Sequence, residues 1–379
     1  MFHAKEGSTA RLIQLCIVYF IFYVITGLTV KYFLGAADKG LPGMHGFEFL
    51  AYSTLGSVIL IAPFTLVMRW YRMQSARLIS LGGIKIPIEL LYIIPSGVCT
   101  GIIIPTTTIM YSLPISVMVA MIIMRGAVIV ISRLVDAIQI KQGILKKSVY
   151  WEENIAVLFA VCAIATHLVW AGEGGFDFIH SMVAVVTLIA YVASYALRIY
   201  IMNYYKNTAG KGVKRDNKAF FSWEQYAALI TLGLVTFVVF KSSAWFGWNA
   251  SQIVDFRHSI TMPHTMWGWA ILAGTAFGFC SFFSVFIFMF KGRTATFAGL
   301  VNRLTSLVAG TTATLLFWVA FNGNFPKMQD WLSLGFIVVA IVFLTRAEKK
   351  RARELEQTKE LDDVVVANGN VETKSEQAA

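Results

Sequence analysis

The sequence is poor in charged residues, which make up only 14% of it, whereas 57% of its residues are apolar. Soluble domains carry about 25% charged residues, so this composition excludes an ordinary soluble protein and predicts an integral membrane protein. Cysteine is scarce as well, and its four copies all fall within apolar runs: Cys16, Cys99, Cys162 and Cys280. That placement is typical of small buried side chains and not of a disulfide scaffold or a metal site.

Two kinds of motif are also missing. The sequence contains no phosphate-cradling glycine loop of the kind that ATP-driven pumps use, and no spacing of His, Cys, Asp or Glu typical of a metal centre. We therefore expect no cofactor, no bound metal and no enzymatic activity.

What the chain does have is apolar runs close to the ~20 residues that a helix needs to cross a bilayer. We count ten. They are Leu12–Leu34, Phe47–Met68, Ile88–Ser112, Pro114–Ser132, Glu153–Gly172, Ser181–Asn203, Glu224–Phe240, Trp267–Phe290, Ala295–Phe321 and Trp331–Leu344.

The net charge of +11 is unevenly distributed. With a cytoplasmic N-terminus, 24 of the 32 Lys and Arg residues fall on the cytoplasmic side and four on the other, with four left in apolar runs. This bias predicts an even number of spans with both termini in the cytoplasm. The basic charge then reflects topology and implies no nucleic-acid partner.

Features of the first half recur in the second. Gly97, Gly101 and Arg125 are echoed by Gly274, Gly278 and Arg303, while Glu48 is echoed by Glu224. Because each half holds five helices, an odd number, the second half must enter the membrane in the opposite sense. The fold class predicted is an all-α membrane protein of ten transmembrane helices arranged as two inverted five-helix repeats. We expect a cytoplasmic N-terminus at 1–11, repeats at 12–172 and 173–345, and a charged, disordered cytoplasmic tail after a short helical extension at 346–379.

Two sequence motifs complete this pattern. The first expected helix ends in Gly27-Leu28-Thr29-Val30-Lys31-Tyr32, and the fourth carries Met124-Arg125-Gly126-Ala127-Val128-Ile129. The pattern resembles the drug/metabolite transporter superfamily, including its nucleotide-sugar transporter branch. The resemblance covers roughly residues 11–346 and implies alternating access through a central cavity.

Arg125 and Arg303 are the strongest candidate binding residues. Each lies ~15–18 Å inside its apolar run, where a charge is costly and needs a partner or a water-filled cavity. Few acidic residues fall within the apolar runs, which favours an anionic substrate held by the planar guanidinium groups. The alternative is that backbone carbonyls, neighbours such as Asn302, Thr305 and Ser306, or a distant glutamate hold them.

Lys31, Arg198, Glu48 and Glu224 form a second group of candidates. Lys31 and Arg198 lie near the ends of their runs, where they either bind substrate or extend to the membrane interface. Glu48 and Glu224 open their runs, so a capping or interfacial role competes with ion coupling.

Hydroxyl groups form the third group. Tyr23 and Tyr191 lie in matching runs and either bind substrate or pack. Thr107 follows Pro105 in a stretch that either faces the cavity or forms an ordinary kink.

The sequence therefore predicts a secondary transporter that moves a small polar, anionic metabolite by exchange or ion coupling. Its expected partners are that small molecule and the lipid bilayer; the oligomeric state is open. The alternatives are an exporter of neutral or cationic compounds on the same fold, a membrane-embedded enzyme and a non-transporting scaffold. A bacterial inner membrane and a eukaryotic endomembrane both fit.

Overall fold

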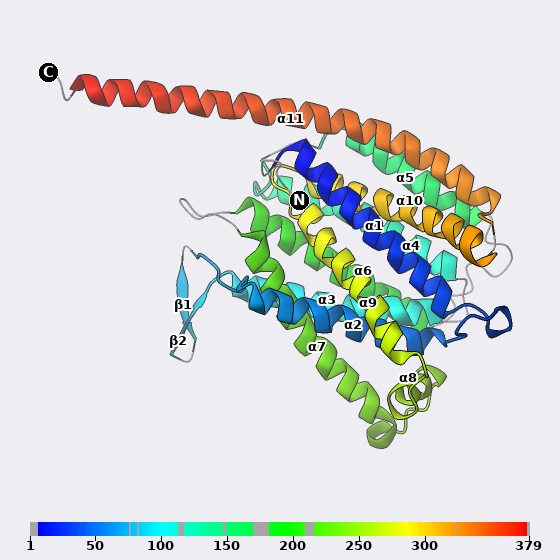
Figure 1. Ribbon diagram of the computed structural model, residues 1–379. Coiled ribbons are helices and arrows are strands. Elements are labelled where there is room, and N and C mark those ends of the chain that lie inside the picture. The colour runs from blue at the N-terminus through cyan, green and yellow to red at the C-terminus, as the bar shows by residue number, and fades with distance from the viewer. Residues whose placement is uncertain are drawn as a thin grey trace.

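A computed structural model describes residues 7–75, 77–81, 83–112, 117–146, 149–169, 182–208, 216–323 and 325–376. These residues form eleven α-helices, one short 3₁₀ turn and one two-stranded hairpin (Figure 1). The helices are α1 (Thr9–Phe33), α2 (Gly46–Val67), α3 (Leu90–Ser112), α4 (Val117–Lys141), α5 (Trp151–Val169), α6 (Met182–Asn207), α7 (Asn217–Phe246), α8 (Ser251–Thr261), α9 (Trp267–Phe288), α10 (Ala295–Phe321) and α11 (Met328–Glu376).

Eight of the described helices are long and apolar enough to cross a bilayer: α1, α2, α3, α6, α7, α9, α10 and the first part of α11. Their outward faces carry rows of exposed aliphatic side chains, such as Ile13, Ile17 and Ile21 on α1. Rows of this kind suit contact with lipid and would be unfavourable in water. The prediction of a multi-pass helical membrane protein is confirmed.

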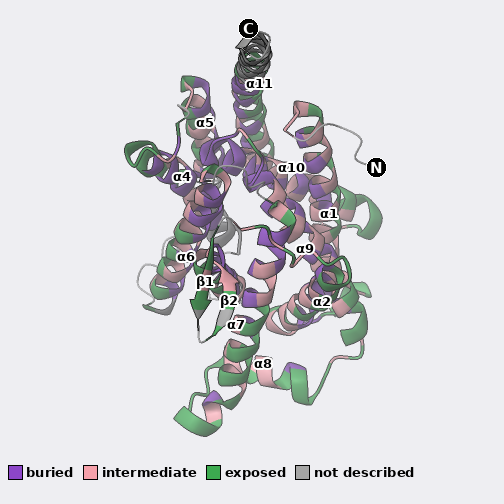
Figure 2. Cartoon of the chain, turned by 90° about the vertical axis from the view of Figure 1, so that its left-hand side faces the viewer, coloured by how far each residue is buried: buried purple, intermediate pink, exposed green. Residues whose placement is uncertain are grey.

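The helices pack in a defined set of pairs. α1 packs against α9 and α10, α6 against α3 and α4, α2 against α9, and α7 against α3. α4 also packs against α10 and α5, and α11 packs against α5 and α10. Figure 2 shows the resulting arrangement, with buried residues on the inward faces and exposed ones concentrated on outer faces and loops.

Glycines allow two of these pairs to approach closely, as their four-residue spacing predicts. A Cβ added at Gly101 of α3 would lie 2.7 Å from the Thr231 Cβ of α7, and one at Gly278 of α9 would lie 2.8 Å from the Ser57 oxygen of α2. A side chain at either position would push the helices apart.

Three elements differ from the expectation. Leu78–Leu81 (β1) and Ile84–Pro87 (β2) pair antiparallel in the loop between α2 and α3. In the sequence, Gly82-Gly83 separates these two short segments, and such a pair of glycines favours a hairpin turn. The amphipathic α8 was not expected either. α7 begins at Asn217, capped by Asp216, and not at Glu224, so Glu224 lies in its third turn.

At the C-terminal segment, the helical extension that follows the last membrane segment is longer than expected. α11 continues without a break from the membrane segment to Glu376 and runs well past the bundle (Figure 1). The stretch from Ala347 to Leu361 is rich in strong helix formers and has no Gly or Pro, which favours continuation of the helix past the membrane segment. The N-terminus of α1, the hairpin and the far end of α11 lie at the same end of the bundle, which we call the basic end.

Candidate functional site

Arg125 lies in the first half of α4 and Arg303 in the first half of α10, two helices that pack together. Each side chain is buried, with 8% of each residue exposed. An arginine keeps its charge at this depth, so its surroundings must supply compensation.

Arg125 reaches across to α1. Its Nη2 donates a hydrogen bond of 2.8 Å to the Tyr23 hydroxyl, and its Cζ lies 5.6 Å from the centre of that ring. The structure therefore places Tyr23 beside Arg125, a contact that the sequence analysis did not predict.

Arg303 faces α6. Its Cζ lies 5.2 Å from the ring centre of Tyr195, a geometry that permits a cation–π contact. Its Nε is buried and has no hydrogen-bond partner among the described residues. Tyr19 and Tyr191 lie near enough to interact with it electrostatically.

Four tyrosines thus surround the two arginines: Tyr19 and Tyr23 on α1, and Tyr191 and Tyr195 on α6. The ring centres are 5.5 Å apart in the first pair and 4.8 Å in the second. Tyr19 interacts electrostatically with both arginines, so the two cations share one neighbourhood. We call this group the arginine–tyrosine cluster.

Tyr19 and Tyr195 were missed from the sequence. The signal was present, because Tyr-x-x-x-Tyr occurs at Tyr19–Tyr23 and again at Tyr191–Tyr195. Residues four apart share one face of a helix. The two motifs therefore present paired rings on α1 and on α6.

The positive charges of Arg125 and Arg303 are not compensated by carboxylates in the described part of the chain. Among the residues that the structure describes, neither Arg125 nor Arg303 forms an ion pair. The three neighbours considered as alternatives make other hydrogen bonds. Asn302 donates to Ser284, Thr305 to the Val301 carbonyl and Ser306 to the Arg303 carbonyl. Among the described residues, none of the three accepts a hydrogen bond from the guanidinium group of Arg125 or Arg303.

Arg198 is in a different situation. On α6 it forms a two-pronged ion pair with Glu224 of α7, through Nε–Oε1 at 2.9 Å and Nη2–Oε2 at 3.1 Å. Glu224 is fully buried and also accepts hydrogen bonds from Ser96 and Thr100 of α3. The interfacial role considered for Arg198, and the capping role considered for Glu224, are therefore wrong.

Lys31, Glu48 and Thr107 lie apart from the cluster. Lys31 is half-buried in the last turn of α1, and Glu48 lies in the first turn of α2, where its Oε1 accepts a 3.3 Å hydrogen bond from Tyr52. The Thr107 hydroxyl donates to the Ile103 carbonyl of its own helix at 2.7 Å. Its donor is thus already used within α3, close to Pro105.

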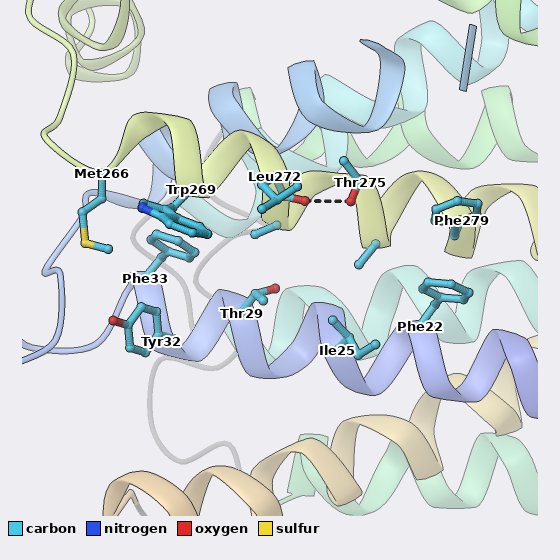
Figure 3. Close-up of a pocket in the computed structure, with 12 residues that line it drawn as sticks. Phe22, Ile25, Thr29, Tyr32, Phe33, Met266, Trp269, Leu272, Thr275 and Phe279 are labelled. Carbon is cyan, nitrogen blue, oxygen red and sulfur yellow. Dashed lines mark hydrogen bonds between the residues drawn. The ribbon is translucent and has the colours of Figure 1, made fainter. Parts of the chain in front are cut away.

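An apolar cavity of about 590 Å³ lies between α1 and α9 (Figure 3). Tyr32, Phe33 and Trp269 line one part of it, and Phe22 and Phe279, whose rings stack at 4.7 Å, line another. Neither arginine lines this cavity. A second apolar hollow of about 530 Å³ lies between α3 and α6, with Cys99 and Ser194 in its wall.

Polar contacts gather at the basic end and join several helices. Asp136 of α4 accepts hydrogen bonds from the backbone amides of Ala295 and Thr296 at the start of α10, at 2.9 and 2.6 Å. This carboxylate satisfies amides that the helix leaves without an internal partner. Asn203 of α6 donates to the same Asp136 carboxylate.

α11 takes part in this network through the turns that follow its membrane segment. Glu348 pairs with Arg293, whose Nε lies 2.6 Å from Oε2, and accepts a hydrogen bond from Thr9 of α1 at 2.9 Å. Lys350 pairs with Glu152 of α5. The residues Thr9, Glu152, Arg293, Glu348 and Lys350 form what we call the α11 clasp.

Next to the clasp, Arg351 stacks over the ring of Tyr150 at 4.2 Å. Burial raises the pKa of Tyr150 to about 12, so its hydroxyl stays protonated at neutral pH.

No protein-family model and no curated protein matches the chain. Solved structures do match it, and 21 of their chains do so with significance. One is described only as the crystal structure of a protein. It is similar over 90% of this chain and 99% of its own length, with a TM-score of 0.54 and 12% sequence identity. At that identity the likeness supports the fold alone, and the protein defined so far is a multi-pass helical membrane protein.

Proposed function

We propose that this protein is a secondary transporter that moves a small anionic metabolite across the membrane by alternating access. The observation that carries the proposal is the arginine–tyrosine cluster, which holds two buried guanidinium groups and no ion-paired carboxylate among the described residues. Two buried cations without a counter-charge are costly in a membrane protein. An anion that arrives from solution would supply the missing charge.

The packing pairs support an inverted repeat of ten spans. Let α1, α2, α3, α4 and α5 correspond to α6, α7, α9, α10 and α11. If each helix is replaced by its counterpart, every one of four packing pairs becomes another pair that also occurs in the structure. They are α1–α10 with α6–α4, α1–α9 with α6–α3, α2–α9 with α7–α3, and α4–α5 with α10–α11. The correspondence leaves two further packing pairs unchanged, α4–α10 and α5–α11, because each joins a helix to its own counterpart. Repeats of this kind place the substrate site near the middle of the bilayer, where their halves meet.

On this proposal the fold is of the drug/metabolite transporter type, and the basic end faces the cytoplasm, as the bias of Lys and Arg favours. Both termini then lie in the cytoplasm. Opening toward the cytoplasm requires the α11 clasp and the Asp136 contacts to separate, because they tie α1, α4, α5, α10 and α11 together at that end.

The transport test is uptake into proteoliposomes that contain the purified protein. A panel of labelled anionic, neutral and cationic metabolites is added outside, with and without the same compound inside. Uptake of anions that rises with an internal counter-substrate supports exchange of anions. Uptake confined to neutral or cationic compounds favours the alternative exporter and removes the role proposed for Arg125 and Arg303.

The remaining alternatives make different demands on the site. A membrane-embedded enzyme needs an acid, base or nucleophile beside the bound molecule, and it would convert a compound without moving it. A scaffold needs neither, and it would leave every compound of the panel outside and unchanged.

A further inference from the structure

We infer that the arginine–tyrosine cluster selects anions that carry two negative charges over singly charged anions and zwitterions. The inference rests on the proposed function and specifies its substrate class. It follows from an accounting of the charges around Arg125 and Arg303.

The first step concerns the number of cations. Arg125 and Arg303 are each more than nine-tenths buried, they come from helices that pack together, and Tyr19 interacts with both. The Nε of Arg303 has no partner among the described residues. A singly charged anion would compensate one guanidinium and leave the other uncompensated, whereas a doubly charged anion compensates both.

The second step concerns what surrounds the cations. The groups in contact with them are tyrosines, which offer hydroxyl groups and ring faces. No carboxylate pairs with either guanidinium in the described part of the chain. An ammonium group on the substrate would therefore face two like charges and find no counter-charge, which disfavours amino acids.

The third step is the contrast with Arg198. This equally buried arginine has its own carboxylate and two further hydroxyl donors on that carboxylate. The same bundle therefore compensates one buried cation with a carboxylate of its own. The missing counter-charge at Arg125 and Arg303 amounts to two units, and a dicarboxylate or a phosphate monoester carries that charge near neutral pH.

The experiment measures binding to the purified full-length chain by thermal unfolding in detergent at fixed ionic strength, since a ligand of the folded state raises the unfolding temperature. Two matched series are used. Succinate, its monomethyl ester and 4-aminobutyrate have similar length and carry two, one and zero net negative charges. Methyl phosphate and dimethyl phosphate repeat the comparison with phosphorus oxyanions near pH 8. The two series distinguish a carboxylate ligand from a phosphate ligand.

We expect the doubly charged member of at least one series to bind about tenfold or more tightly than its singly charged relative, with 4-aminobutyrate the weakest. Arg303→Gln should reduce this preference to about twofold or less. Arg303→Lys should retain it, because it keeps the charge. Arg133→Gln, which removes a half-buried cation from the basic end of α4, is the matched control and should leave it unchanged.

Equal or tighter binding of the singly charged members overturns the inference and leaves anion transport standing. Tight binding of 4-aminobutyrate overturns it as well. Binding of no member of either series, together with uptake of no anion, overturns both the inference and the proposed function.

Discussion

Two kinds of buried arginine occur in this bundle. Arg198 is 5% exposed and carries a carboxylate partner within 3.1 Å, while Arg125 and Arg303 are 8% exposed and contact tyrosines. The three arginines are therefore buried to a similar extent, but among the described residues only Arg198 of the three is paired with a carboxylate of the chain. Where a cation serves to join helices, the chain provides the anion; where it does not, we propose that the substrate does.

The largest effect is expected from Glu224→Gln. It leaves Arg198 buried without its counter-charge, which we expect to cost roughly 3–5 kcal/mol of stability. Thermal or denaturant unfolding of the purified protein measures the loss. The double variant Arg198→Met/Glu224→Met should recover most of it, because both charges then leave together. An unchanged unfolding transition in Glu224→Gln would show that the ion pair is not structural.

The arginines without carboxylates should respond in the opposite way. Arg125→Met and Arg303→Met should abolish anion uptake while leaving the unfolding temperature unchanged or raised, since each removes an uncompensated buried charge. Uptake and unfolding are measured on the same preparation. If these variants lose as much stability as Glu224→Gln, the two kinds of arginine do not differ.

A carboxylate placed in the cluster should compete with the substrate. Tyr195→Glu provides an internal anion beside Arg303, and we expect it to weaken anion binding by about tenfold or more. Tyr195→Gln is the matched control, because it has the same size as the glutamate without its charge. Equal binding by the two variants would contradict the idea that the substrate supplies the counter-charge.

Tyr23→Phe removes the hydroxyl that Arg125 contacts at 2.8 Å. A hydrogen bond to a charged group contributes about 1.5–3 kcal/mol, so we expect a loss of roughly ten- to a hundredfold in anion affinity if the bond orients Arg125 for binding. Tyr226→Phe, which removes a hydroxyl bonded to Thr65 on α2, serves as the control. A normal affinity in Tyr23→Phe would remove Tyr23 from the site.

The smallest effect concerns the α11 clasp. Glu348→Gln weakens its contacts with Arg293 and Thr9 and should favour opening of the basic end. Alkylation of a cysteine introduced at Ala295, which is buried beneath the network, should then become several-fold faster. An unchanged rate would show that the clasp does not hold that end closed.

The sequence predicts the membrane class well because apolar runs and the shortage of charge are local properties. It also predicts the close helix contacts of Gly101 and Gly278, since a four-residue spacing places both glycines of a motif on one face. It misjudges Arg198 and Glu224 because their pairing joins α6 to α7, which are separate in the sequence. It also places the start of the helix at Glu224, whereas α7 begins at Asn217.

The candidate site was predicted in part. Arg125, Arg303, Tyr23 and Tyr191 were identified from depth and repetition, and the structure brings them together. Tyr19 and Tyr195 were not identified, because a tyrosine in an apolar run gives no sign of the cation it faces. Only the packing of α1 and α6 against α10 and α4 reveals that neighbourhood.

The most direct test of the central claim is an experimental structure of the protein with its best-transported anion bound. We predict that oxygens of the anion lie within hydrogen-bond distance, about 3 Å, of the guanidinium groups of both Arg125 and Arg303. An anion bound elsewhere, with either arginine paired to a carboxylate of the chain, would contradict the account.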